Sequence, residues 1–174
     1  MRKENLMLDR MVDEKVVELL NNEKWIIIET LTAPIMLKNY KCETLKIYFD
    51  IELTTRVKRA YISSDTISLN DLQLKINDKD SVSRDIIKNL RWFDIFDEEL
   101  MYDNNDIIID NSTHDEIYDK NIIEKEKKLH LDLLIACVLV ARKEMRWHNI
   151  PDQDYNQAKV FIEKNSKLVK KINF

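Results

Sequence analysis

The chain has 174 residues, of which 44% are hydrophobic and 34% charged, and none is glycine. Walker loops, dinucleotide-binding fingerprints and nucleophile elbows all need glycine where the backbone approaches a phosphate or turns sharply. The absence of glycine therefore excludes these three kinds of site. The net charge is −4. The length suffices for one well-packed core, and we expect residues 1–174 to form a single domain.

The N-terminal part, residues 1–53, predicts a helix followed by a small antiparallel sheet. Apolar residues recur at helical spacing over residues 4–21, and Asn21-Asn22 would end this helix. Three apolar or alternating stretches then predict a β-meander over residues 24–53, namely Trp25–Leu31, Ile35–Leu37 and Leu45–Leu53. The last of them alternates apolar and polar residues, which is typical of a strand with one buried face.

The middle part, residues 54–110, predicts a succession of short elements. In chain order they are a basic helix at 55–62, an extended step at 66–67, a helix from Ser68 through Ile76 with an approximate capping box to Asp71, a turn at 77–80, a helix from Ser81, and a hairpin with strands at 100–102 and 107–109. This order resembles the winged helix-turn-helix superfamily over residues 53–110, by pattern alone. The resemblance implies a second helix that enters the major groove of DNA, flanked by the hairpin.

Residues 115–174 predict a C-terminal pair of helices. The first is apolar nearly all round, so we expect it at the centre of the core. Asn149-Ile150-Pro151 breaks this first helix. The last helix begins with acidic residues and ends with lysines, which suits the helix dipole. Its inward-facing residues are expected to extend to Leu168 and Val169. The expected fold class is therefore α+β: an N-terminal helix and small antiparallel sheet, a winged-helix-like middle and a C-terminal helical pair.

Charge is concentrated in one acidic segment. Residues 97–119 contain nine acidic side chains and no lysine or arginine. Uncompensated carboxylates steer a basic partner towards a surface and suppress wrong partners. The candidate partner-binding residues are Asp97, Glu98, Glu99, Asp103, Asp106 and Asp110. The alternative is a solvated segment whose charge only keeps the protein in solution.

A DNA-binding function would use other residues. On the second helix of the winged-helix pattern, Arg84, Lys88 and Arg91 would contact the duplex. Affinity for DNA comes mainly from neutralising its phosphates, and the neighbouring acids would repel these phosphates. A winged helix used for contact with protein is therefore at least as good an interpretation.

One motif points to an enzyme. Arg142 and His148 enclose five residues, a spacing similar to the catalytic signature of HEPN ribonucleases. The resemblance implies that the arginine stabilises the scissile phosphate and the histidine transfers protons. However, Lys143 follows where that family often has a polar or acidic residue, and the alternative is a helix end decorated with cations. A carboxylate–lysine nuclease pattern at Asp50-x-Glu52 fails, because Thr54 occupies the position of the lysine.

The remaining residues favour a cytoplasmic protein without cofactor or metal. Cys42 and Cys137 are far apart and have no metal-ligand spacing, and the tryptophans fit core or interface positions. No apolar run approaches the ~20 residues needed to cross a bilayer. We expect a small non-catalytic regulator, of the kind made by phages and mobile elements, that inhibits or modulates a basic nucleic-acid-handling protein. A DNA-binding transcriptional regulator and a HEPN-like ribonuclease are the alternatives.

Overall fold

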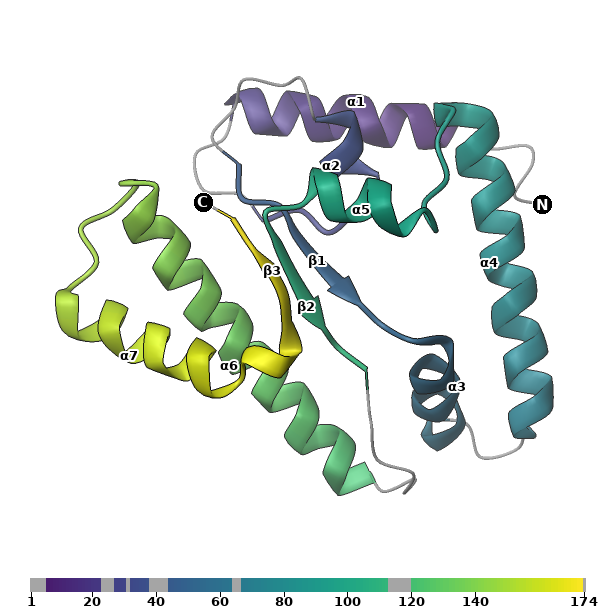
Figure 1. The fold of residues 1–174 in the computed structure, drawn as a ribbon. Coiled ribbons are helices and arrows are strands. Elements are labelled where there is room, and N and C mark those ends of the chain that lie inside the picture. Colours follow the sequence, from purple (N-terminus) through teal and green to yellow (C-terminus); the bar gives the residue numbers. More distant parts are fainter. Residues whose placement is uncertain are drawn as a thin grey trace. The chain divides into compact units, whose positions relative to one another are not determined.

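The computed structural model describes residues 6–22, 27–30, 32–37, 44–63, 67–112 and 120–173 (Figure 1). In chain order its elements are α1 (Leu6–Asn22), α2 (Ala33–Met36), β1 (Ile47–Asp50), α3 (Leu53–Ile62), α4 (Leu69–Arg91), α5 (Glu98–Asn104), β2 (Ile107–Asp110), α6 (Lys120–Glu144), α7 (Asp152–Lys164), a 3-10 turn (Ser166–Leu168) and β3 (Val169–Ile172). These elements confirm the α+β class. No helix in the described ranges is long and apolar enough to cross a lipid bilayer.

The chain divides into two compact units, and each unit is built from two separate stretches of sequence. The first unit combines Met1–Thr44 with Lys79–Asn104, and the second combines Leu45–Asp78 with Asn105–Phe174. The units therefore interleave along the chain, whereas the three predicted parts follow one another. We describe each unit by itself.

The second unit contains a three-stranded mixed sheet in the order β1-β2-β3. The central strand β2 pairs with β1 in parallel, from Ile47↔Ile107 to Asp50↔Asp110. It pairs with β3 in the antiparallel sense. Because two parallel neighbours end at the same edge of a sheet, the carboxyl ends of β1 and β2 lie together.

A β-bulge interrupts the pairing of β2 with β3. Ile108 pairs with Lys171, but the next residue, Ile109, pairs with Val169, so Lys170 is an additional residue on β3. A bulge of this kind bends its strand and re-aims the side chain at the bulge. This local irregularity determines where the side chain of Lys170 can reach.

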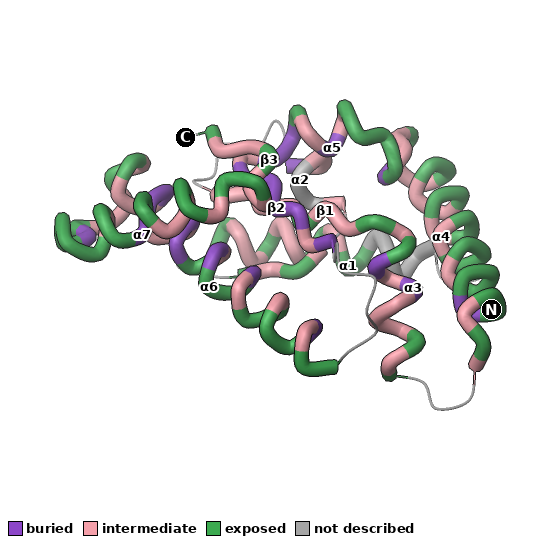
Figure 2. The backbone as a smooth tube through the Cα atoms, turned by 60° about the horizontal axis from the view of Figure 1, so that its bottom comes forward, coloured by how far each residue is buried: buried purple, intermediate pink, exposed green. Residues whose placement is uncertain are grey.

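The core of the second unit is centred on β2, whose three isoleucines are fully buried (Figure 2). Ile107 and Ile109 project from one face of the strand and pack against Leu133 and Cys137 of α6. Burial raises the pKa of the Cys137 thiol to about 11. This thiol therefore stays protonated near neutral pH and serves as an apolar side chain.

The predicted β-meander is wrong over the described residues. Residues 27–30 form no strand, residues 35–36 belong to α2, and β1 pairs with a strand about 60 positions further along the chain. Residues 24–26, 31 and 38–43 lie outside the described residues. Period-two alternation identifies a strand with one buried face, but it carries no information about which strand is its partner. The sheet is consequently mixed and not antiparallel.

The predicted turn at residues 77–80 is also wrong, because α4 is continuous there. Asn and Asp are poor helix formers, but each costs only several tenths of a kcal/mol relative to alanine in a helix interior. Six of the less exposed positions of α4 keep helical spacing through the predicted turn, namely Leu72, Ile76, Asp80, Ser83, Ile87 and Leu90. The pattern of burial therefore overrides two weak local breakers.

The start of α4 confirms the predicted cap. The hydroxyl of Ser68 accepts a hydrogen bond from the backbone N–H of Asp71 at 3.2 Å and donates one to the Asp71 carboxylate at 2.8 Å. The predicted hairpin is wrong, because residues 98–104 form α5 and β2 pairs with β1 and β3. The element order on which the winged-helix resemblance was based is therefore not the order of the structure.

The C-terminal helical pair is confirmed, since α6 and α7 pack extensively against each other. Two details of that prediction are wrong. One face of α6 is open to solvent, with Leu131 and Ile135 54% and 50% exposed. The last helix ends at Lys164, where the side-chain amide of Asn165 donates to the carbonyl of Phe161 at 2.8 Å, and strand β3 follows.

Candidate functional site

Four of the predicted partner-binding acids lie together on or next to α5 and are exposed. We call this set the α5 acidic face, and it consists of Asp97, Glu98, Glu99 and Asp103. The Asp97 carboxylate accepts a hydrogen bond from the backbone N–H of Leu100 at 3.0 Å and so caps the helix. Two of the other acids occupy the first turn, where the helix dipole stabilises negative charge.

The opposite side of α5 holds the helix in place within the first unit. Met101 is only 4% exposed, and α5 packs against α2. The side-chain amide of the buried Asn104 donates to the Leu100 carbonyl at 2.7 Å, which secures the C-terminal turn. The acids are therefore displayed on an anchored helix.

The α5 acidic face is not neutralised by its surroundings. Among the described residues, no lysine or arginine forms an ion pair with Glu98, Glu99 or Asp103. Some other acids of the first unit do have such partners, and examples are Asp13 with Arg91, Asp94 with Arg84, and Glu18 with Lys15. The charge of these three acids on α5 is therefore available to a partner.

The other two predicted acids do not belong to this face. Asp106 and Asp110 lie in the second unit and have contacts within its sheet. The Asp106 carboxylate accepts a hydrogen bond from the backbone N–H of Lys46 at 2.7 Å, and Asp110 is 8% exposed. The expectation of an uncompensated carboxylate is wrong for Asp110, because this residue is buried and paired with Lys170. Residues 113–119 lie outside the described residues.

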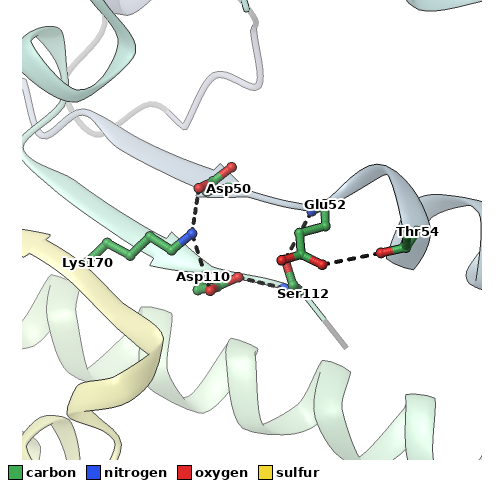
Figure 3. A network of polar contacts seen from close by, with 6 residues as sticks. All are labelled: Asp50, Glu52, Thr54, Asp110, Ser112 and Lys170. Carbon is green, nitrogen blue, oxygen red and sulfur yellow. Dashed lines mark hydrogen bonds and ion pairs between the residues drawn. The ribbon is translucent and has the colours of Figure 1, made fainter. Parts of the chain in front are cut away.

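A network of charged side chains joins the three strands at the edge where β1 and β2 end (Figure 3). The ammonium Nζ of Lys170 lies 2.7 Å from Asp50 Oδ2 and 3.3 Å from Asp110 Oδ2. The backbone N–H of Ser112 donates to Asp110 Oδ1 at 3.0 Å. Parallel pairing brings the two carboxylates together, and the bulge directs the lysine between them.

The protonation of this network follows from opposing effects. Burial raises the pKa of Asp110, but hydrogen bonds from Ser112 and Lys170 outweigh burial and hold that pKa below its ordinary value. Burial likewise lowers the pKa of Lys170, but hydrogen bonds to Asp50 and Asp110 outweigh it and raise that pKa. Asp110 and Lys170 are therefore both charged at neutral pH, and the lysine is unsuited to act as a base there.

The same edge contains the acid of the carboxylate–lysine pattern considered in the sequence. Figure 3 shows Glu52 turned towards Thr54, whose hydroxyl donates to the Glu52 carboxylate at 3.2 Å. The lysine that the local sequence lacks comes from β3, 120 positions after Asp50. No group of three or more His, Cys, Asp or Glu side chains that could hold a metal ion occurs in the part of the chain described.

Asp110→Asn should make the free energy of unfolding less dependent on pH under acidic conditions. Because the pKa of Asp110 is lower in the folded chain, its stabilising effect is complete above its unfolded pKa of about 4 and is lost as the pH falls through the folded value. The wild type should therefore lose unfolding free energy more steeply than the variant as the pH falls below about 4. Urea titrations at each pH would measure this, and parallel curves would contradict it.

The predicted DNA-contacting cations lie on the second half of α4. Arg84 is hydrogen-bonded to Asp94 and lies over the Phe96 ring at 5.9 Å from its centroid, and Arg91 is paired with Asp13. The hydrogen bond from Arg84 lowers the pKa of Asp94. A phosphate would have to displace an acid from each arginine, whereas Lys88 is exposed. DNA contact by these residues stays a prediction.

The residues of the ribonuclease-like motif lie at the connection between α6 and α7. Arg142 is in the last turn of α6, and His148 follows the helix. Between them, Lys143 donates to the carbonyl of Ile150 at 2.9 Å and pairs with Asp152, which closes the helical hairpin. The lysine that departs from the family pattern thus has a structural contact, and ribonuclease activity stays a prediction.

Comparison with protein-family models, with curated proteins and with solved structures finds no match for this chain.

Proposed function

We propose that this protein is a non-catalytic regulator that binds a basic surface of another macromolecule through the α5 acidic face. The observation that carries the proposal is the exposure of all four carboxylates of this face. Among the described residues, no cation is paired with Glu98, Glu99 or Asp103. Acids this close in sequence on one helix act together, because the distance over which physiological salt screens a charge is about 8–10 Å.

The arrangement suits recognition by charge. The carboxylates are attached to an anchored helix, so little backbone conformational entropy is lost when a partner binds. Complementary charge speeds encounter and rejects acidic competitors. We infer that the partner is a basic protein, such as a nucleic-acid-handling enzyme, and that the two meet in the cytoplasm.

Charge reversal on α5 tests the proposal. The variant Glu98→Lys/Glu99→Lys/Asp103→Lys leaves Asp97 in place, because that residue caps the helix. We expect it to weaken partner binding by at least about a hundredfold, since three attractive contacts become repulsive. Wild type and variant would be used side by side to capture partners from nuclease-treated host lysate, and the captured protein would then be titrated by calorimetry.

The matched control reverses three exposed acids of the second unit, Asp132, Asp154 and Glu163, with the same change in net charge. This control should bind like the wild type, and circular dichroism should show that both variants fold. Equal binding by all three proteins would overturn the proposal. Loss of capture after digestion of nucleic acid would favour the DNA-binding alternative.

A further inference from the structure

We infer that Trp92 and Phe96 form an aromatic anchor beside the α5 acidic face, and that this anchor receives an arginine side chain of the basic partner. The inference rests on the proposed function and names the chemistry of the partner. It is an inference about residues 92–99 of the first unit, where two exposed aromatic rings and the first exposed acids of α5 follow one another in the chain.

The exposure of these rings is the first observation. Trp92 is 91% exposed and Phe96 is 42% exposed, while Ile95 between them is only 6% exposed. Tryptophan offers the largest apolar surface of any side chain and is highly buried on average in folded proteins. Of the two positions that the sequence predicted for the tryptophans, the core is therefore wrong for Trp92. A position at an interface stays a prediction for this residue.

The backbone next to Phe96 is fixed by a hydrogen-bonded turn. The Asp94 carboxylate accepts a hydrogen bond from the backbone N–H of Phe96 at 3.0 Å, and the Asp94 carbonyl accepts one from the N–H of Asp97 at 3.2 Å. Burial of Ile95 attaches this turn to the unit. Phe96 thus extends from a turn that is already formed before a partner binds.

The same segment already holds a guanidinium group. Arg84 is gripped from one side by the Asp94 carboxylate, and its guanidinium carbon lies 5.9 Å from the centroid of the Phe96 ring. A carboxylate and an aromatic face together are what an arginine needs, since its planar cation both pairs with acids and stacks on rings. Trp92 offers the better ring of the two, and the first acids of the α5 acidic face follow it in the chain at Asp97 and Glu98.

Charge selects the occupant. A single strand of nucleic acid also stacks on exposed tryptophan, but its phosphates would meet Asp97, Glu98 and Glu99. A lysine would be attracted by the acids but lacks the planar group that stacks. An arginine-rich segment satisfies both the ring and the carboxylates, so it is the partner chemistry to which this surface is complementary.

The test labels the protein with 5-fluorotryptophan and follows its fluorine resonances, with that of Trp92 assigned by the variant Trp92→Phe. The probes are a synthetic peptide alternating arginine with serine, the same peptide with lysine or glutamate instead, and an oligothymidylate. We expect the arginine peptide to shift the Trp92 resonance and to bind more tightly than the lysine peptide. The glutamate peptide and the oligonucleotide should leave it unchanged.

Substitution gives the second readout. Trp92→Asn should weaken binding of the arginine peptide about tenfold, and asparagine tolerates the positive φ of 64° at this position. Trp147→Phe is the control and should bind like the wild type. Tight binding of the arginine peptide with an unmoved Trp92 resonance would overturn the anchor but leave the proposed function intact. If neither the arginine peptide nor the lysine peptide bound, the anchor and the proposed function would both be overturned. A shift of the Trp92 resonance caused by oligothymidylate would indicate that the partner is a nucleic acid and not a protein.

Discussion

Leu133→Ala should lower the free energy of unfolding by about 3 kcal/mol. The Leu133 side chain is fully buried, and it packs against Ile107 and Ile109 where α6 covers the central strand. Its truncation removes the transfer free energy of three carbon atoms and leaves a cavity against a strand that is paired on both sides and cannot easily collapse. Urea denaturation followed by far-ultraviolet circular dichroism would measure the loss.

The chain provides a matched control two residues away. Leu131→Ala is the same exchange on the same helix, but Leu131 is 54% exposed, so its removal opens no cavity. We expect this variant to lose less than about 1 kcal/mol. If the two variants were destabilised equally, α6 would not cover β2 in the way described.

Lys170→Met should destabilise the protein by about 2 kcal/mol. The substitution keeps the aliphatic stem but removes the ammonium that lies between Asp50 and Asp110, and it leaves two carboxylates facing each other. The Asp110 side chain is only 11% exposed, so water cannot fully replace the lost partner. The partial exposure of Lys170, at 31%, keeps the expected loss below that of a fully buried pair.

Two further variants separate this network from the general effect of a lost charge. Lys167→Met removes an exposed lysine three positions earlier and should change stability by no more than about 0.5 kcal/mol. The triple variant Asp50→Asn/Asp110→Asn/Lys170→Met removes the charges together and should recover part of the loss. A triple variant less stable than Lys170→Met would show that the carboxylates do not repel each other at this edge.

Local signals in the sequence predicted the parts of the fold that depend on neighbouring residues. The cap at Ser68, the short helix now seen as α3, and the helical pair of α6 and α7 are examples, because hydrogen bonding and burial within a few turns determine them. The sheet could not be predicted in this way. β1 and β2 pair across about 60 positions, and β3 was hidden in a lysine-rich segment that continues a helical pattern.

The candidate site divides along the same line. Composition alone located the exposed acids of α5, because residues 97–119 contain nine acids and no lysine or arginine. The burial of Asp110 and its pairing with Lys170 depend on strand register and on a bulge, neither of which leaves a local signal. The exposure of Trp92 could not be predicted either, because a tryptophan is highly buried on average in folded proteins.

The interleaved construction of the two units has a practical consequence for dissecting the molecule. The chain changes unit after Thr44, after Asp78 and after Asn104. A single cut at any one of these places leaves at least one unit with part of its chain on a different fragment, and fragments of this kind would expose apolar surface that the whole chain buries. The acidic face of α5 and the charged network of the sheet can therefore be separated by substitution but not by truncation.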